Sequence, residues 1–384
     1  MSNIYTVGST GLYVSGDTGD TWALKSAAEG LVFSSASRGV YVDGANVYVA
    51  TDAGVGVSSD GGASFSMKTT SQELQSDNVR GIHGFGSTIY AGTVAGLAKS
   101  TDSGASWSAV AGWPTGTVSK VFAYDATTIL LSNATEQYKS TDSGANFSGP
   151  TATWSGSTSG HYFYDGTTIF AGATTGLGYS TDVGATWSFY TTSDGLVSNA
   201  TNDAWSDGTT ILAASVTAGI SKSVDYGANW TALDTPDGSY YGDAAYVVTS
   251  DSTNIITAIR DTTDTTGSGI YKSTDGMTGI AWTEKQDAAG AQFYQMVIPS
   301  EAGTQIDAPV DIDSNTEWSD AAPVVNAQVT VTTNSTLTIS GVSAWSDMTF
   351  GAEGNLTIEP GSTLDFLGQT ATVVPDTILK IKPS

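Results

Sequence analysis

Cysteine is absent from this chain of 384 residues, and histidine occurs only twice. Without cysteine there is neither a disulfide nor a cysteine nucleophile, and His83 and His161 alone are too few for an ordinary zinc site. We therefore expect no cofactor and no metal. Basic residues are also scarce, since 13 Lys and Arg stand against 38 Asp and Glu, a formal net charge of −25 at pH 7. That balance speaks against nucleic acid or an anionic membrane as a partner.

Long apolar runs are missing too. No stretch approaches the roughly 20 apolar residues of a membrane span. The first residues, Met1-Ser-Asn-Ile-Tyr-Thr-Val, have neither the basic nor the apolar region of a secretory signal peptide. We expect a product that is made in a cytoplasm and does not insert into a membrane. Glycine is abundant, with 45 residues against 9 prolines, which fits many short strands joined by tight turns.

One pattern of eight residues recurs along the chain: Ser, any residue, Asp, any residue, Gly, two residues, then Trp or Phe. We call it the octet. Six copies are regular, and the seventh, Ser273–Trp282, has two extra residues before its Gly. A fixed period of 40 to 50 residues predicts a propeller or a similar array. The acidic residues of the seven copies are Asp17, Asp60, Asp102, Asp142, Asp182, Asp225 and Asp275.

The residue types of the octet favour a structural role for this pattern. An Asp side chain accepts hydrogen bonds from the amides that follow it and so closes a turn. The Gly permits a positive φ, and the aromatic residue buries a large apolar area where the next strand begins. A metal ligand or a catalytic acid is the alternative, but catalysis needs one constellation and not seven.

The octet resembles the Asp box of the sialidase-type (BNR) repeats, which lies in the hairpin between the third and fourth strands of a propeller blade. The resemblance covers residues 1–299. It implies a fold and leaves the function open, because propellers of this kind include hydrolases, sorting receptors, assembly factors and binding modules.

The ends of this region predict how the ring closes. Short apolar segments around each octet give four strands per repeat, as in a propeller blade. The chain starts with Asn3–Gly8, which matches a second strand, and residues 292–298 form a lone strand after the last octet. We expect an all-β, seven-bladed propeller over residues 1–299, in which this C-terminal strand completes the first blade and leaves no open edge. Residues 300–308 are the expected linker.

A second β-rich domain is expected over residues 309–384. Leu337-Thr-Ile339 recurs as Leu356-Thr-Ile358, and strands at such steps resemble the rungs of parallel β-helices in bacterial and viral surface proteins. A small β-sandwich is the alternative. A solenoid this short with uncapped ends is poorly stable alone. We therefore expect this domain to serve oligomerisation or attachment, with a homotrimer as the specific hypothesis.

The catalytic residues that the sialidase resemblance would imply are missing. Those enzymes need three arginines around a carboxylate, a Tyr–Glu pair and an acid Asp, whereas this chain has only Arg38, Arg80 and Arg260 and lacks the opening Arg-Ile-Pro signature. Xyloglucan hydrolases with similar repeats use two propellers, and only one is expected here. We expect no enzyme, although two carboxylates at glycosidase spacing remain an open alternative.

A candidate ligand site emerges when the blades are aligned on their second strands. One equivalent position, near the start of the innermost strand, then holds Arg38, Arg80, Lys120, Gly160, Asn202 and Tyr246. The candidates for ligand binding are Arg38, Arg80, Lys120, Asn202 and Tyr246. One hypothesis is a contact with an anion or a glycan, helped by Tyr41, His83 and Tyr162. The other is that the basic residues pair with Asp residues that line the central channel.

The combination of a propeller with a β-helix-like end resembles bacteriophage structural proteins. The favoured hypothesis is a tail fibre or another virion-surface appendage that binds host glycans, with other virion proteins as partners. Repeated copies would turn weak sugar contacts into avidity. The alternatives are a capsid decoration or neck scaffold protein without a receptor role, and a glycoside hydrolase that degrades polysaccharide.

Overall fold

The computed structural model describes the propeller region in detail and the C-terminal region only as strands. The described residues are 3–33, 37–113, 116–151, 154–156, 158–215, 217–233, 243–250, 253–261, 269–273, 282–287 and 293–297, together with the backbone of ten short strands between residues 310 and 381. The chain divides into two compact units, Asn3–Ile298 and Pro299–Ser384. In the described part of the chain, no helix is long and apolar enough to span a bilayer.

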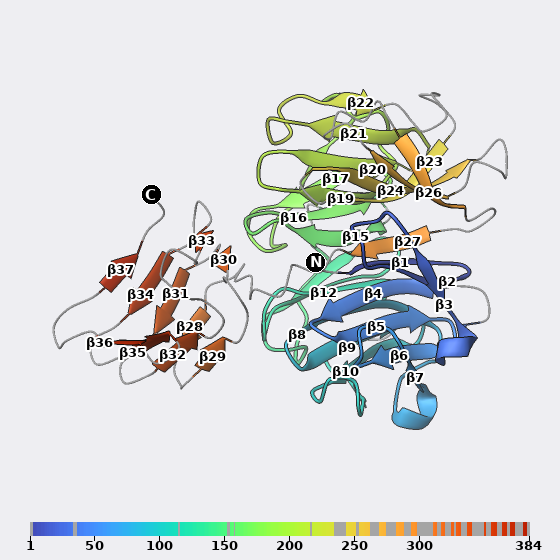
Figure 1. Ribbon diagram of the computed structural model, residues 1–384. Coiled ribbons are helices and arrows are strands. Elements are labelled where there is room, and N and C mark those ends of the chain that lie inside the picture. Colours follow the sequence, from blue (N-terminus) through green and yellow to red (C-terminus); the bar gives the residue numbers. More distant parts are fainter. Residues whose placement is uncertain are drawn as a thin grey trace. The chain divides into compact units, whose positions relative to one another are not determined.

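Seven antiparallel sheets make up the first unit, so the predicted all-β, seven-bladed fold is confirmed (Figure 1). Six sheets have four strands, and the sheet β12–β14 has three, with an isolated bridge from Lys139 to Ser148 beside it. Two 3-10 turns, η1 (Ala27–Glu29) and η2 (Thr70–Gln72), accompany them. The first three sheets are β27 (Phe293–Val297), β1 (Ile4–Gly8), β2 (Gly11–Ser15), β3 (Ala23–Lys25); β4 (Ser37–Asp43), β5 (Asn46–Thr51), β6 (Gly54–Ser58), β7 (Ser66–Lys68); and β8 (Val79–Phe85), β9 (Thr88–Thr93), β10 (Gly96–Ser100), β11 (Ser108–Ala109). The other four are β12 (Lys120–Ala123), β13 (Ile129–Ser132), β14 (Gln137–Ser140); β15 (Thr158–Tyr164), β16 (Ile169–Ala173), β17 (Gly176–Ser180), β18 (Ser188–Tyr190); β19 (Thr201–Ser206), β20 (Ile211–Ser215), β21 (Gly219–Ser223), β22 (Thr231–Leu233); and β23 (Asp243–Ser250), β24 (Ile255–Asp261), β25 (Gly269–Ser273), β26 (Trp282–Asp287).

The innermost strands form a closed ring. In order, β4, β8, β12, β15, β19, β23 and β27 each contact the next, and β27 contacts β4 again. Strand β27 pairs antiparallel with β1, with Tyr5 opposite Val297 and Thr6 opposite Met296 (Figure 1). The Thr6 hydroxyl also donates a hydrogen bond of 2.9 Å to the carbonyl oxygen of Gln295. The predicted closing strand is therefore confirmed, and the first blade has no free inner edge.

The closure has an apolar core and a polar seam. Phe293 of β27 is fully buried in a cluster that includes Ile4, Tyr13 and Ile256. At the seam, the ammonium of Lys272 donates to the carbonyl oxygen of Thr18 at 2.8 Å. The carboxylate of Asp20 forms two salt bridges, with Nζ of Lys272 at 3.2 Å and with Nζ of Lys285 at 2.9 Å. The last blade is thus joined to the first octet by side chains as well as by β27.

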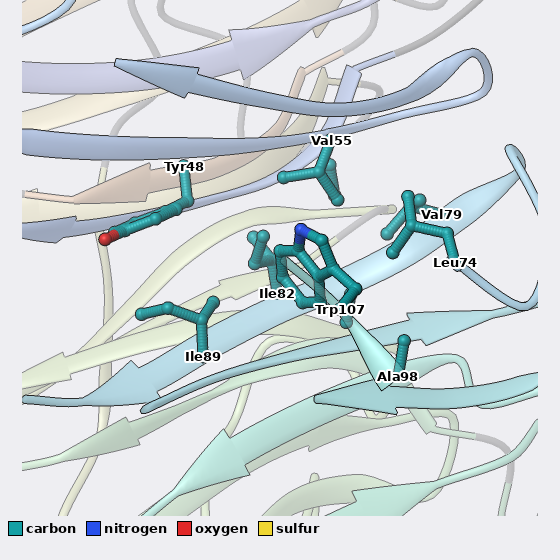
Figure 2. Close-up of a cluster of buried hydrophobic side chains, with 10 residues drawn as sticks. Tyr48, Val55, Leu74, Val79, Ile82, Ile89, Ala98 and Trp107 are labelled. Atoms are coloured by element: carbon teal, nitrogen blue, oxygen red, sulfur yellow. The ribbon is translucent and has the colours of Figure 1, made fainter. Parts of the chain in front are cut away.

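The aromatic residue that ends each octet packs between neighbouring blades. Figure 2 shows Trp107, which is 3 % exposed, among Tyr48 and Val55 of one blade and Ile89 and Ala98 of the next. A buried side chain of this size contributes about 2 kcal/mol or more to folding. The predicted burial of the octet aromatic is therefore confirmed at Trp107.

The hydrogen bonds inside the octet repeat from copy to copy. In the copy that begins at Ser58, the Ser58 hydroxyl donates to Oδ1 of Asp60 at 2.7 Å and accepts the N–H of Gly62 at 2.9 Å. The same Oδ1 accepts the N–H of Ser64, also at 2.9 Å. The five other regular copies have equivalent bonds. Asp275 and the seventh copy lie outside the described residues.

The residue between Asp and Gly in the octet has a second task that the sequence did not suggest. Its φ is positive even where it is not glycine, for example 58° at Thr18 and 53° at Tyr226. This conformation turns its carbonyl oxygen toward the preceding blade. The carbonyl oxygens of Thr18, Gly61, Ser143 and Tyr226 accept hydrogen bonds from Lys272, Tyr5, Tyr90 and Tyr190, respectively. In these four copies the octet therefore fastens its blade to the preceding one.

Acid is expected to weaken the propeller through these turns. The hydrogen bond from the Ser64 side chain is the main reason why the pKa of Asp60 falls from its ordinary 3.8 to about 2, and Asp17 and Asp102 have the same lowered pKa. A lowered pKa stabilises the fold fully above pH 3.8, and the effect is lost as the pH falls toward 2. We expect the free energy of unfolding, measured by urea titration, to fall steeply across this window and less steeply in Asp60→Asn. An equal slope in both proteins would contradict this role.

The second unit is built from stacked parallel strands. One stack contains β28 (Val310–Ile312), β31 (Gln328–Val331) and β34 (Asn355–Ile358), another contains β29 (Thr316–Trp318), β32 (Thr336–Ile339) and β35 (Thr363–Phe366), and a third pairs β30 (Val324–Val325) with β33 (Thr349–Phe350). Strands β36 (Gln369–Thr372) and β37 (Leu379–Ile381) add antiparallel edges to β35 and β34. Parallel stacking is the pairing of β-helix rungs and differs from the antiparallel sheets of a typical sandwich.

The two Leu-Thr-Ile segments are 19 residues apart, and steps of this size occur between the first pairs of rungs, Val310 with Val329 and Thr316 with Leu337, but the next step is 27 residues. The two Leu-Thr-Ile segments do not lie one above the other, because Leu337 pairs with Leu364 and Leu356 pairs with Val329. They belong to different stacks of the same coil. Their likeness reflects the alternation of apolar and polar residues that any such strand needs.

Candidate functional site

Four of the five candidate residues, Lys120 being the exception, share one backbone feature. Arg38, Arg80, Asn202 and Tyr246 are each the extra residue where the pairing of an innermost strand shifts by one. Such a β-bulge places two residues opposite one and re-aims the side chain of the extra residue. The structure therefore gives these four residues equivalent places on β4, β8, β19 and β23.

Lys120 reaches this region by a different route. It is regularly paired with Ser132, whereas the alignment placed it at the bulge position. The cause is the hairpin from β12 to β13, which runs from Ala123 to Ile129 and is one residue longer than the hairpin from Tyr164 to Ile169 in the next blade. The N–H of Ser119 donates a hydrogen bond of 2.7 Å to the carbonyl oxygen of Ser132, the residue with which Lys120 is paired. Ser119 and Lys120 therefore both lie opposite Ser132.

Charged side chains from neighbouring inner strands meet around Lys120. Its ammonium nitrogen lies 2.7 Å from Nε2 of His161 on β15. The pKa of Lys120 is lowered to about 7, mainly by burial; the charge of Asp203 acts in the opposite direction, and the cations Arg38 and Arg80 add to the lowering. We call Arg38, Arg80, Lys120, His161 and Asp203 the inner-strand cluster; they come from five consecutive strands, β4, β8, β12, β15 and β19.

Asp203 is the carboxylate of the cluster. It is 5 % exposed, and its Oδ2 accepts the N–H of Val248 at 3.1 Å. Burial raises the pKa of Asp203 to about 7, although the N–H groups of Val248 and Ala204 and the charge of Lys120 favour its ionised form. Lys120 and Asp203 thus influence each other through their charges, while the pairing of the basic residues with Asp stays a prediction.

Two candidate residues are engaged in contacts within the fold. The Nδ2 group of Asn202 donates to the backbone carbonyl of Tyr246 at 2.5 Å, which ties β19 to β23. The ring of Tyr246 packs against the apolar cluster at the closure. These contacts give both residues a structural task.

The aromatic residues expected beside the site form a row of packed rings. Ring centroids are 4.7 Å apart for Tyr41 and His83, 4.8 Å for His83 and Phe122, and 5.8 Å for Phe122 and Tyr162. Burial lowers the pKa of His83 to about 4, and its Nδ1 accepts the N–H of Ala123. The Tyr162 hydroxyl donates to the side chain of Gln137. The row supports the inner strands on which the cluster lies.

Sequence reasoning missed His161 and Asp203. His161 follows Gly160, one of the aligned positions, and Asp203 follows Asn202, another. A titratable residue directly after an aligned position was therefore the available signal. No group of three or more His, Cys, Asp or Glu residues in the described ranges is placed to hold a metal ion.

Comparisons with known proteins show the fold. No family model matches the sequence, and no curated protein matches it. The GH74 enzyme of Niastella koreensis is similar in structure, with a TM-score of 0.55, 17% identity and coverage of 73% of this chain and 51% of that chain. For the GH74 xyloglucanase of Xanthomonas campestris the values are 0.52, 16%, 73% and 52%.

A smaller propeller is similar as well. The protein YCF48, in its structure bound to the D1 peptide, gives a TM-score of 0.50 at 15% identity and covers 65% of this chain and 81% of that chain. At such identities the likeness shows a shared propeller fold. The chain spans about half the length of the two GH74 structures.

Proposed function

We propose that this chain is a carbohydrate-binding protein of a bacteriophage virion surface, such as a tail fibre. In this proposal the propeller binds a host glycan at the inner-strand cluster, and the second unit joins copies into a homotrimer and to other virion proteins. The observation that carries the proposal is the gathering of Arg38, Arg80 and Lys120 on three consecutive inner strands of a chain with a net charge of −25. Cations collected in this way are suited to an anionic or hydroxyl-rich ligand.

Binding without hydrolysis is favoured by the surroundings of Asp203. Glycoside hydrolases ordinarily use two carboxylates that flank the scissile bond. Asp203 has the raised pKa of a general acid, but it is buried and bonded to Val248. Among the described residues, the charge that acts on the pKa of Asp203 is that of Lys120 and not a second carboxylate.

Association of several copies would raise the total affinity for a polysaccharide even if each glycan site binds weakly. The two four-stranded sheets of the second unit end in β28 and β37 and in β29 and β36, and in this proposal a further copy pairs with such an end strand. Three propellers on one stem would raise the avidity for a repeating polysaccharide well above the affinity of one site.

The full-length protein tests this proposal directly. We expect it on purified virions, with a trimeric mass in light scattering, and retained on host polysaccharide without release of reducing sugar. Arg80→Gln should weaken retention by about tenfold, which corresponds to the ~1.4 kcal/mol of one charge-assisted hydrogen bond. Lys25→Gln on the outer strand β3 is the matched control, because it removes the same charge far from the inner strands.

The alternatives give different results. Sugar release that Asp203→Asn abolishes would support a hydrolase. Location at the capsid or neck, without retention on any glycan, would support a scaffold role. A monomeric mass would contradict the role given to the second unit.

A further inference from the structure

The contact between Lys120 and His161 places an amine beside a proton carrier. A lysine ammonium only donates hydrogen bonds, whereas each imidazole nitrogen either donates or accepts. At 2.7 Å, the Lys120 nitrogen and Nε2 of His161 therefore share one proton. Either the ammonium donates to a neutral ring, or the ring N–H donates to a neutral amine. His161 is 7 % exposed, while Lys120 keeps partial access to solvent.

Burial is the main factor that favours the neutral amine of Lys120. Arg38 on β4 and Arg80 on β8 repel the ammonium form, and Asp203 on β19 is the acidic group that opposes them. With burial, the balance brings the pKa of Lys120 to about 7. An amine that is unprotonated near neutral pH is a nucleophile, and neighbouring cations or desolvation are the usual means of producing one.

We propose that Lys120 condenses reversibly with a small carbonyl compound that also carries an anionic group, and that Arg38 and Arg80 attract that group. The lone pair of the Lys120 nitrogen attacks the carbonyl carbon and forms a carbinolamine. The carbon–oxygen bond then breaks, water leaves, and an imine remains, so that no electrons are exchanged with a third reagent. His161 takes a proton from the nitrogen and returns it to the departing hydroxyl.

The two arginines define the ligand class. A neutral aldehyde gains nothing from them, whereas a carboxylate or phosphate beside the carbonyl is drawn to the same place as the amine. A sugar acid in its open-chain form carries both groups. The inference does not depend on glycan binding, since the condensation is a property of Lys120 and its neighbours.

Reductive trapping on the full chain tests the proposal. The protein is treated with glyoxylate, an aldehyde with a carboxylate, or with propanal, its neutral counterpart, in the presence of cyanoborohydride. Peptide mass spectrometry then gives the rate of modification at each lysine. With glyoxylate we expect Lys120 to react at least tenfold faster than Lys25 or Lys68, and the rate at Lys120 to level off above about pH 7.

Variants separate this reactivity from a structural role. Arg80→Gln should slow the reaction of Lys120 with both aldehydes, because it removes a cation that repels the ammonium form, and it should lower the ratio of the glyoxylate rate to the propanal rate several-fold. His161→Gln should slow both reactions, and Lys120→Arg should remove the modified peptide. Modification spread over the lysines according to exposure would overturn the proposal, as would equal rates with the two aldehydes in both the parent protein and Arg80→Gln.

Discussion

Replacing Gly227 with alanine is expected to destabilise the propeller by about 3 kcal/mol or more. Gly227 has a φ of 90°, a conformation that L-residues rarely adopt. A Cβ atom there would overlap the ring of Tyr190, which belongs to the preceding blade. That ring has little room to move, since it stacks on Tyr179 at 4.4 Å and its hydroxyl donates to the carbonyl of Tyr226 at 3.1 Å. The cost therefore combines backbone strain with an overfilled contact between blades.

Gly208→Ala is the matched control for Gly227→Ala. Gly208 has a φ of 84°, but nothing lies within 4 Å of the position that its Cβ would take. In the control, the free energy of unfolding should fall by only about 1 to 2 kcal/mol, the cost of placing an L-residue at a positive φ. Urea unfolding followed by tryptophan fluorescence measures both values. If the two variants lose the same free energy, the Gly227 turn does not fasten the blades in the way described.

Phe293→Ala is expected to cost about 3 to 5 kcal/mol, because it empties a site in the core of the closing strand. Phe293 is fully buried, and its ring lies 5.7 Å from that of Tyr13. Strand β27 is the single element that completes the first blade, so the cavity weakens the pairing of β27 with β1. Besides a lower unfolding midpoint, we expect faster hydrogen exchange at the amides of β1.

Phe85→Ala provides the comparison for Phe293→Ala. Phe85 ends β8 and is 40 % exposed, so its truncation should cost about 0.5 kcal/mol or less. If the two variants lose similar free energies of unfolding, or if hydrogen exchange in β1 is unchanged in Phe293→Ala, the stability of the propeller does not depend on its closing strand β27.

Most of the propeller could be predicted because its repeat is local. Within the copy that starts at Ser100, the bonds among Ser100, Asp102 and Gly104 involve residues close in the chain, so the sequence alone specifies the turn. The closing strand could be predicted because an unfinished blade at one end and a lone strand at the other have one economical arrangement. The structure has this arrangement, with Thr6 of β1 paired with Met296 of β27.

The site was harder to predict than the fold. Whether Lys120 occupies the bulge depends on one residue in the hairpin before Ile129, and counting back from the second strand does not reveal it. The partners His161 and Asp203 lie on the next two blades, and the packing of successive inner strands, which the sequence does not show, places them near Lys120. The Leu-Thr-Ile repeat misled for a similar reason, since the lengths of the turns between rungs decide which strands stack.

The pairing of Tyr5 with Val297 means that the chain enters and leaves the propeller at adjacent points. A domain with this property can be inserted into a surface loop of an unrelated protein without stretching its host. We therefore expect that the propeller can be inserted into a surface loop of another protein and that both the propeller and the host protein keep their folds.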